Sequence, residues 1–100
     1  MSRSIYQRFR LLLLQLQAND HRPDRWECAV LERVLVTLSL GRRSASPGEA
    51  ESWRFLAASY LDFYEQERTR TPRAKEHMAA AERPLAAFID ELDALGCDAS

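Results

Sequence analysis

One apolar segment, residues 26–41, constrains what this chain can fold into more than any other stretch. On a helix with about 100° per residue, its apolar side chains occupy nearly the whole circumference, and Glu32, Ser39 and Cys28 form a narrow polar strip. A helix that is apolar nearly all round is typical of the centre of a protein. We therefore expect the other segments to pack around this one on every side.

The same segment has a second interpretation, because residues 34–40 alternate as they would in a β-strand. A strand needs a neighbour to pair its backbone N–H and C=O groups. The sequence contains no second strand-like run that could serve as this neighbour. The helix is therefore the preferred prediction.

Local signals place the ends of the first three helices. Ser2 or Ser4 can cap the first helix, and Asn19-Asp20 stops it. Gly41 is expected to end the central helix in a left-handed conformation. Ser46-Pro47-Gly48-Glu49 combines an N-cap, a proline at the first helical position and the spacing of a capping box. The broad apolar face predicted for this third helix contains Ala50, Trp53, Leu56, Ala57, Tyr60, Leu61, Phe63 and Tyr64.

A fourth helix is predicted after Thr71-Pro72, and Pro84 interrupts it. Proline removes a backbone donor and clashes with the preceding turn, so we expect a kink or a break near Pro84. Because the apolar stripe keeps its phase across Pro84, a single kinked helix is preferred. The predicted fold is one all-α domain of 100 residues, a four-helix bundle-like arrangement of helical hairpins. The predicted helices are at about 3–18, 24–40, 47–69 and 72–95, with a loose tail at 97–100.

Composition points to the cytoplasm. No apolar run is long enough for a secretory signal or a membrane span. Cys28 and Cys97 are too few for a disulfide framework, so two reduced thiols are expected. The chain has thirteen arginines and one lysine, a bias that we attribute to a GC-rich bacterial or phage genome.

Residues suited to catalysis are scarce. The two histidines, His21 and His77, lie in a predicted loop and at the edge of a predicted apolar stripe. No metal-binding spacing occurs, and no lysine follows Gly41 or Gly48 as a phosphate-binding loop requires. We therefore expect no enzyme activity, no metal site and no cofactor.

Apolar residues outside the predicted stripe and the unequal charge of the two halves of the chain suggest that the protein binds a partner instead. Leu11 and Leu14 lie off the apolar stripe of the first helix, so they are either covered by a neighbour or form an exposed patch. Residues 1–48 carry eight arginines and four carboxylates, a balance of +4, whereas residues 49–100 carry six bases and eleven carboxylates, a balance of −5. The candidate partner-binding residues are Arg3, Arg10, Leu11, Leu14, Arg42, Arg43 and Phe55.

Part of the sequence resembles a tetratricopeptide repeat. The spacing of Trp53, Leu56, Ala57 and Tyr60 is similar to the first helix of that repeat, and Ala74, Met78 and Ala81 are similar to its second. The two halves lie too far apart and no second copy follows, whereas such repeats stack on one another. The resemblance therefore implies a helical hairpin and no particular partner.

These features predict a non-catalytic protein–protein interaction module. Its partner would be another protein or protein complex, and it could act as an adaptor, a chaperone or a phage-type inhibitor. Such an inhibitor would occlude a larger, nucleic-acid-handling host complex such as a CRISPR defence complex. Opposite charges on the two halves also suit self-association as a homodimer.

The alternative function is binding or regulation of nucleic acid through the Arg-rich N-terminal half. We rank it second because the net charge is −1, and dedicated nucleic-acid binders are usually basic. The arginines that it would use are Arg3, Arg8, Arg10, Arg22, Arg25, Arg42 and Arg43.

Overall fold

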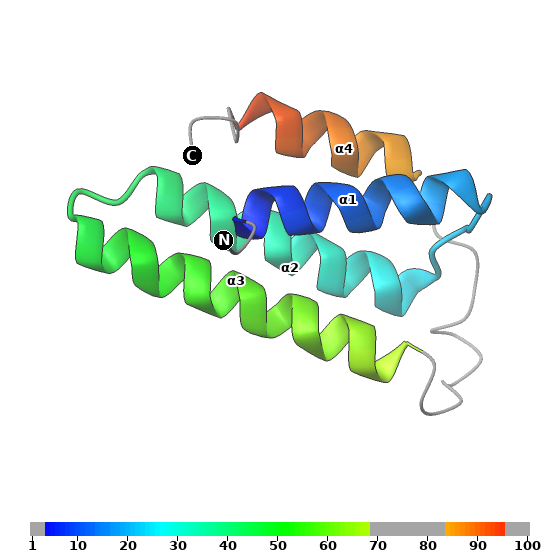
Figure 1. Cartoon of the computed structure of the whole chain (residues 1–100), viewed down its shortest axis with the longest axis horizontal. Coiled ribbons are helices and arrows are strands. Elements are labelled where there is room, and N and C mark those ends of the chain that lie inside the picture. The colour runs from blue at the N-terminus through cyan, green and yellow to red at the C-terminus, as the bar shows by residue number, and fades with distance from the viewer. Residues whose placement is uncertain (1–3, 69–83, 96–100) are drawn as a thin grey trace.

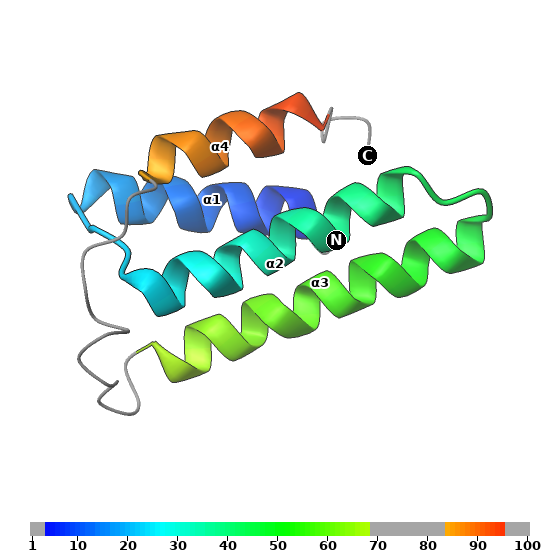
Figure 2. The ribbon, with the colours of Figure 1, turned by 180° about the vertical axis from the view of Figure 1, so that it is seen from behind.

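The computed structural model describes residues 4–68 and 84–95, and the regular elements found there are helices. They are α1 (Ile5–Ala18), α2 (Arg25–Arg42), α3 (Pro47–Glu67) and α4 (Leu85–Ala94). Successive helices run in opposite directions, and α2 lies beside α3 while α1 lies beside α4 (Figures 1 and 2). The all-α, bundle-like prediction is confirmed.

The core lies between the helices and takes side chains from all four. It is built mainly of leucine, with aromatic rings from α1, α3 and α4. Each helix contributes at least two residues whose side chains are fully shielded from solvent, as expected when an apolar stripe faces the interior. These residues are Phe9 and Leu13 of α1, Leu31, Val34 and Leu38 of α2, Ala57, Leu61 and Tyr64 of α3, and Phe88 and Leu92 of α4.

Both ends of α1 are closed by local hydrogen bonds. Ser4, not Ser2, is the N-cap, and it exchanges capping-box hydrogen bonds with Gln7 at 3.2 and 3.3 Å. At the other end, Asp20 adopts the left-handed conformation with φ 53°, and the His21 N–H donates to the Leu16 carbonyl at 3.0 Å. This pattern is a Schellman motif. The predicted stop at Asn19-Asp20 is confirmed.

The starts of α2 and α3 are capped differently from each other. Asp24 caps α2 and forms a complete capping box with Glu27, a feature missing from the sequence prediction. Ser46 caps α3 by accepting a hydrogen bond from the Glu49 N–H at 3.2 Å. The predicted second half of that box is absent, because the Glu49 carboxylate accepts from the Ser44 hydroxyl instead.

Gly41 does not end α2, so that prediction is wrong. The helix continues to Arg42, and its C-cap, Arg43, has φ −90° and ψ −3°. Gly41 is buried, and a Cβ atom added to it would lie 3.1 Å from the Cβ of Trp53 on α3. Its role is therefore to let α2 and α3 approach closely, not to reverse the chain.

Pro84 separates α4 from what precedes it. It is the N-cap of α4, with φ −77° and an extended ψ of 157°. The preferred prediction of one kinked helix running through Pro84 is therefore wrong, because α4 begins only after this residue. A proline ring inside a helix would clash with the carbonyl four residues earlier. The predicted helix over 72–83, its apolar residues and the tail at 97–100 lie outside the described residues.

Candidate functional site

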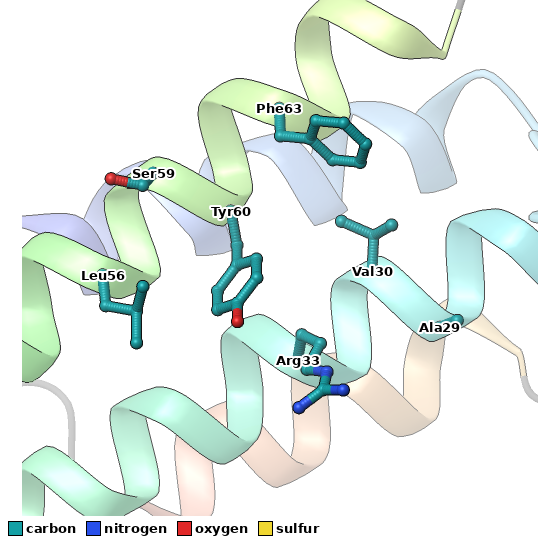
Figure 3. A pocket seen from close by; sticks show the side chains of 7 residues that line it. All are labelled: Ala29, Val30, Arg33, Leu56, Ser59, Tyr60 and Phe63. Atoms are coloured by element: carbon teal, nitrogen blue, oxygen red, sulfur yellow. The ribbon is translucent and has the colours of Figure 1, made fainter.

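A groove runs between α2 and α3 on the outside of the bundle (Figure 3). It encloses about 500 Å³. Residues at helical spacings of three and four line each side, as expected for side chains on one helix face. The lining residues are Ala29, Val30 and Arg33 of α2 and Leu56, Ser59, Tyr60 and Phe63 of α3.

Large apolar side chains of α2 and α3 are exposed to solvent, and two of them, Leu56 and Phe63, line the groove. The exposed fractions are 50% for Val36, 38% for Leu40, 38% for Leu56 and 47% for Phe63. Val36 also borders a shallow hollow on α2 together with Ala29, Glu32 and Arg33. We call these five residues, Ala29, Val36, Leu40, Leu56 and Phe63, the α2–α3 face. Single exposed apolar residues are ordinary on protein surfaces, whereas a gathered group marks a binding site.

The α2–α3 face corrects two predictions. The central helix was expected to be covered on every side, but Val36 and Leu40 face solvent. Leu56 and Phe63 were expected in the core, but α3 turns Ala57, Leu61 and Tyr64 inward instead. The predicted apolar arc of each helix is wider than the neighbouring helices can bury, so one edge of the arc stays outside.

Arg33 is the only charged residue among those that line the groove, and none of them is acidic. Its helical neighbours three and four positions away are Ala29, Val30, Val36 and Thr37, none of them acidic, and Glu32 lines an adjoining hollow together with Arg33. No ion pair joins Arg33 to another residue within 4–68 or 84–95. In Figure 3 the Tyr60 side chain extends from α3 toward α2, with its hydroxyl on the side of Arg33.

An aromatic cluster holds one end of the groove. The Trp26 ring stacks on Tyr64, with centroids 5.9 Å apart and planes 14° apart. The same ring lies 5.9 Å from the ring of Phe63 at a tilt of 52°. Tilted and offset aromatic pairs of this kind are favourable. Phe63 is therefore supported on one side by a ring from α2 while its other side is open to solvent.

Beneath this cluster lies a buried polar network centred on Glu27. Its carboxylate accepts a hydrogen bond from the Tyr64 hydroxyl at 2.7 Å and from the Asp24 N–H at 3.1 Å. The His21 Nε2 lies 2.7 Å from the same Oε1 atom that Tyr64 contacts. Burial first, and then the hydrogen bond to Glu27, raises the pKa of the Tyr64 hydroxyl well above its usual value.

Both oxygens of Glu27 are thus used to join the start of α2, the end of α3 and the loop before α2. Such a fully bonded group serves as an anchor, since a buried carboxyl without partners would be costly. The sequence analysis missed this network. The spacing of Asp24 and Glu27 is that of a capping box, and this signal could have identified its first half.

The predicted partner-binding residues are spread over several surfaces. Leu11 and Leu14 of α1 are partly exposed and share a shallow hollow with Gln7 and Arg10. Phe55, 75% exposed, projects from the outer side of α3. Arg42 and Arg43 are exposed at the end of α2, and Arg3 lies outside the described residues. None of these residues lines the α2–α3 groove.

The arginines of α1 are engaged within the molecule. Arg8 contacts both Asp62 and Glu65 of α3. Arg10 pairs with Asp93 of α4 through Nε at 2.9 Å. The hydrogen bond from Arg10 lowers the pKa of Asp93. Part of the charge difference between the two halves of the chain is therefore compensated inside one molecule.

The pKa of Arg8 responds to the same contacts. Partial burial acts to lower this pKa, but hydrogen bonds and attraction from Asp62 and Glu65 together raise it. Arg8 therefore stays positively charged where α1 meets α3.

Two other kinds of site are not found in the described part of the chain. Residues 4–68 and 84–95 contain no group of three or more His, Cys, Asp or Glu side chains placed to hold a metal ion. No helix in those ranges is long and apolar enough to cross a membrane. Comparison with family models, curated proteins and solved structures finds no match for this chain.

Proposed function

We propose that this protein is a non-catalytic binding module that holds a helix of another protein against the α2–α3 face. The observation that carries the proposal is the groove between α2 and α3, which is lined by Leu56 and Phe63, each more than a third exposed, and adjoined along α2 by a hollow that the exposed Val36 lines. Complete burial of one such side chain contributes roughly 1.5–3 kcal/mol. A partner that covers even part of this face would gain substantial free energy.

The shape of the groove favours a helix as its occupant. It lies between two neighbouring helices, so a third helix can pack its side chains between theirs. Leu56 and Phe63 are seven positions apart in the sequence, which corresponds to roughly 10 Å along a helix. This distance matches apolar residues at positions i and i+7 of a partner helix. An adaptor, a chaperone or a phage-type inhibitor could each use such a groove to hold another protein.

The groove is a better basis for function than the Arg-rich N-terminal half. Two of the arginines that a nucleic-acid surface would use, Arg8 and Arg10, pair with carboxylates of α3 and α4. A phosphate backbone would have to compete with these groups. We also propose that the module works in the cytoplasm, the compartment in which cysteine thiols stay reduced.

Phe63 and Phe55 provide a matched test, because both are exposed phenylalanines of α3 and only Phe63 lines the groove. The probe is a displayed library of amphipathic peptides about five helical turns long, selected on the wild-type protein. We expect Phe63→Ser to weaken the selected peptides about 10- to 100-fold, as loss of an interface aromatic does. Phe55→Ser should leave their affinity unchanged. Circular dichroism must show that both variants keep the wild-type helix content.

The proposal fails if the selected peptides bind Phe63→Ser as tightly as they bind the wild-type protein. It also fails if the library yields no peptide that binds the wild-type protein more tightly than it binds Phe63→Ser. A second substitution, Leu56→Ser, covers the opposite end of the groove and should reproduce the effect of Phe63→Ser.

A further inference from the structure

We infer that the occupant of the groove is an acidic amphipathic helix, which places a carboxylate against Arg33. This inference rests on the proposed binding function and specifies the chemistry of the partner. Its starting point is the composition of the lining: one guanidinium, two hydroxyls, four apolar side chains and no carboxylate. A helix that enters this groove therefore meets positive charge and no negative charge from the lining.

Arg33 differs from the arginines of α1 in what surrounds it. Arg8 and Arg10 each contact a carboxylate of another helix, whereas Arg33 has no such contact within the described ranges. Glu32, adjacent in sequence, shares a hollow with Arg33 beside the groove, but no ion pair joins these two residues of the described chain. The charge of Arg33 is therefore available to a partner at the rim of an apolar surface, where an ion pair contributes more than in open solvent.

Tyr60 supplies a second donor beside Arg33. Its side chain lines the groove, and its hydroxyl lies on the Arg33 side in Figure 3. The hydroxyl has no hydrogen bond to another residue of the described chain. Ser59 is different, because its hydroxyl donates to the Phe55 carbonyl at 3.1 Å. A carboxylate has two oxygens, so one group could accept from both Arg33 and Tyr60.

Leu56 and Phe63 set the positions of apolar residues in the partner. Tyr60 lies between them in sequence, four positions after Leu56 and three before Phe63. The complementary helix would carry apolar residues at i and i+7 and an acidic residue at i+3 or i+4. Charge then selects the partner, because a basic residue at this position would face Arg33.

Part of the acidic surface of a second copy of this chain is already used within that copy. Three carboxylates of α3 and α4, those of Asp62, Glu65 and Asp93, already contact arginines of α1. To reach Arg33 of another copy, they would have to leave these contacts. A helix from another protein has no such cost.

The test uses peptides from the selection above that differ at a single position. One peptide is made with Glu, Gln or Lys at the position that faces Arg33, and fluorescence anisotropy gives each dissociation constant at low ionic strength. We expect the wild-type protein to bind the Glu peptide about threefold more tightly than the Gln peptide and at least about tenfold more tightly than the Lys peptide. In Arg33→Glu the order should reverse. Arg54→Glu, which changes an exposed arginine outside the groove, should keep the wild-type order.

The possible failures are distinguishable. If all three peptides bind the wild-type protein equally and Phe63→Ser abolishes binding of each, the groove binds helices but the acidic preference is wrong. If Arg54→Glu reverses the order as Arg33→Glu does, net charge and not Arg33 sets the preference, and the inference fails. If light scattering shows a homodimer that Phe63→Ser dissociates, the occupant is a second copy and the inference fails as well.

Discussion

Arg10 and Arg33 lie on different helices of the same bundle, and their surroundings differ. Arg10 on α1 reaches Asp93 of α4, and its neighbour Arg8 reaches carboxylates of α3. Arg33 on α2 lines an apolar groove that contains no carboxylate. Arg8 and Arg10 of α1 are therefore paired with carboxylates of the chain itself, whereas Arg33, beside the α2–α3 face, has no such pair within the described residues.

This difference indicates which surface of a small helical protein without recognisable motifs is the better candidate for a binding site. Exposed charge alone is uninformative, because much of it is used within the molecule. Exposed apolar residues alone are also uninformative, because most proteins have some. The combination of an exposed apolar surface and an arginine without a carboxylate partner in the described chain occurs at the α2–α3 groove, and this is where we place the binding site.

The largest effect on stability is expected on the inner side of α3, and the outer side of the same helix provides the comparison. Leu61 is fully buried and Phe63, two residues later, is half exposed. Leu61→Ala should lower the free energy of unfolding by about 2–5 kcal/mol, because it leaves a cavity in the core. Phe63→Ala should cost about 1 kcal/mol or less, since it removes mainly the contact with Trp26. Urea denaturation measures both values, and equal losses would show that the α2–α3 face is core.

A smaller effect tests how closely α2 and α3 must approach. Gly41→Val would place side-chain atoms against Trp53, whose Cβ lies 3.1 Å from the position of the first added carbon. We expect a loss of about 1–3 kcal/mol, typical of overpacking. Gly48→Val is the control, because nothing lies within 4 Å of its added Cβ, and a change within about 0.5 kcal/mol is expected. Thermal unfolding of the two variants measures both effects. A Gly41→Val variant as stable as the wild-type protein would contradict close packing of α2 against α3.

Alkaline pH provides the next comparison. The pKa of Tyr64 is raised in the folded protein, so the unfolded chain loses this proton first as pH rises above about 10. The unfolded state then binds fewer protons than the folded state, and stability falls as pH increases. Below about pH 10 the contribution is fully present. In Tyr64→Phe the alkaline decline should be shallower than in wild type in urea titrations between about pH 9 and 11, and an equally steep decline would contradict this role of Tyr64.

The smallest expected effect concerns the ion pair between Arg10 and Asp93. The pKa of Asp93 is lowered by Arg10, so the pair stabilises the protein above the ordinary pKa of an aspartate, and this contribution is lost as pH falls through the lowered value. Because the pair is exposed, water screens it, and Asp93→Asn should cost less than about 0.5 kcal/mol at neutral pH. Thermal unfolding at low and high salt measures the cost. A loss above about 2 kcal/mol, beyond the range of exposed pairs, would show that this pair carries much of the attachment of α4.

Much of the fold could be predicted from local signals. As predicted from their side-chain chemistry, Ser4 caps α1, Ser46 caps α3, and α1 ends at Asn19-Asp20. Such caps and turns depend only on neighbours within a few residues. The prediction for Gly41 failed for a different reason. Glycine suits both a helix end and a close helix contact, and only the position of Trp53 shows which role applies.

The candidate site could not be predicted in the same way. Helical periodicity showed that Leu56, Phe63 and Tyr64 are near one face, but it could not show that Tyr64 is buried against Glu27 while the other two stay exposed. The predicted binding residues were those outside the apolar stripes, such as Leu14 and Phe55. The groove is instead built from residues inside the apolar arcs, at the edge that the packing leaves uncovered.

The sequence by itself determined the all-α class and the approximate limits of α1, α2 and α3, because these follow from short-range hydrogen bonding and apolar periodicity. The start of α4 was not determined in this way, since that helix was expected from about 72 and begins at Leu85. The tertiary structure decided which edge of each apolar arc is buried and which arginine finds a carboxylate. The physical reason is that burial and ion pairing depend on residues far apart in the chain: Arg8 meets Asp62, and Tyr64 meets Glu27, only once α1, α2 and α3 have packed.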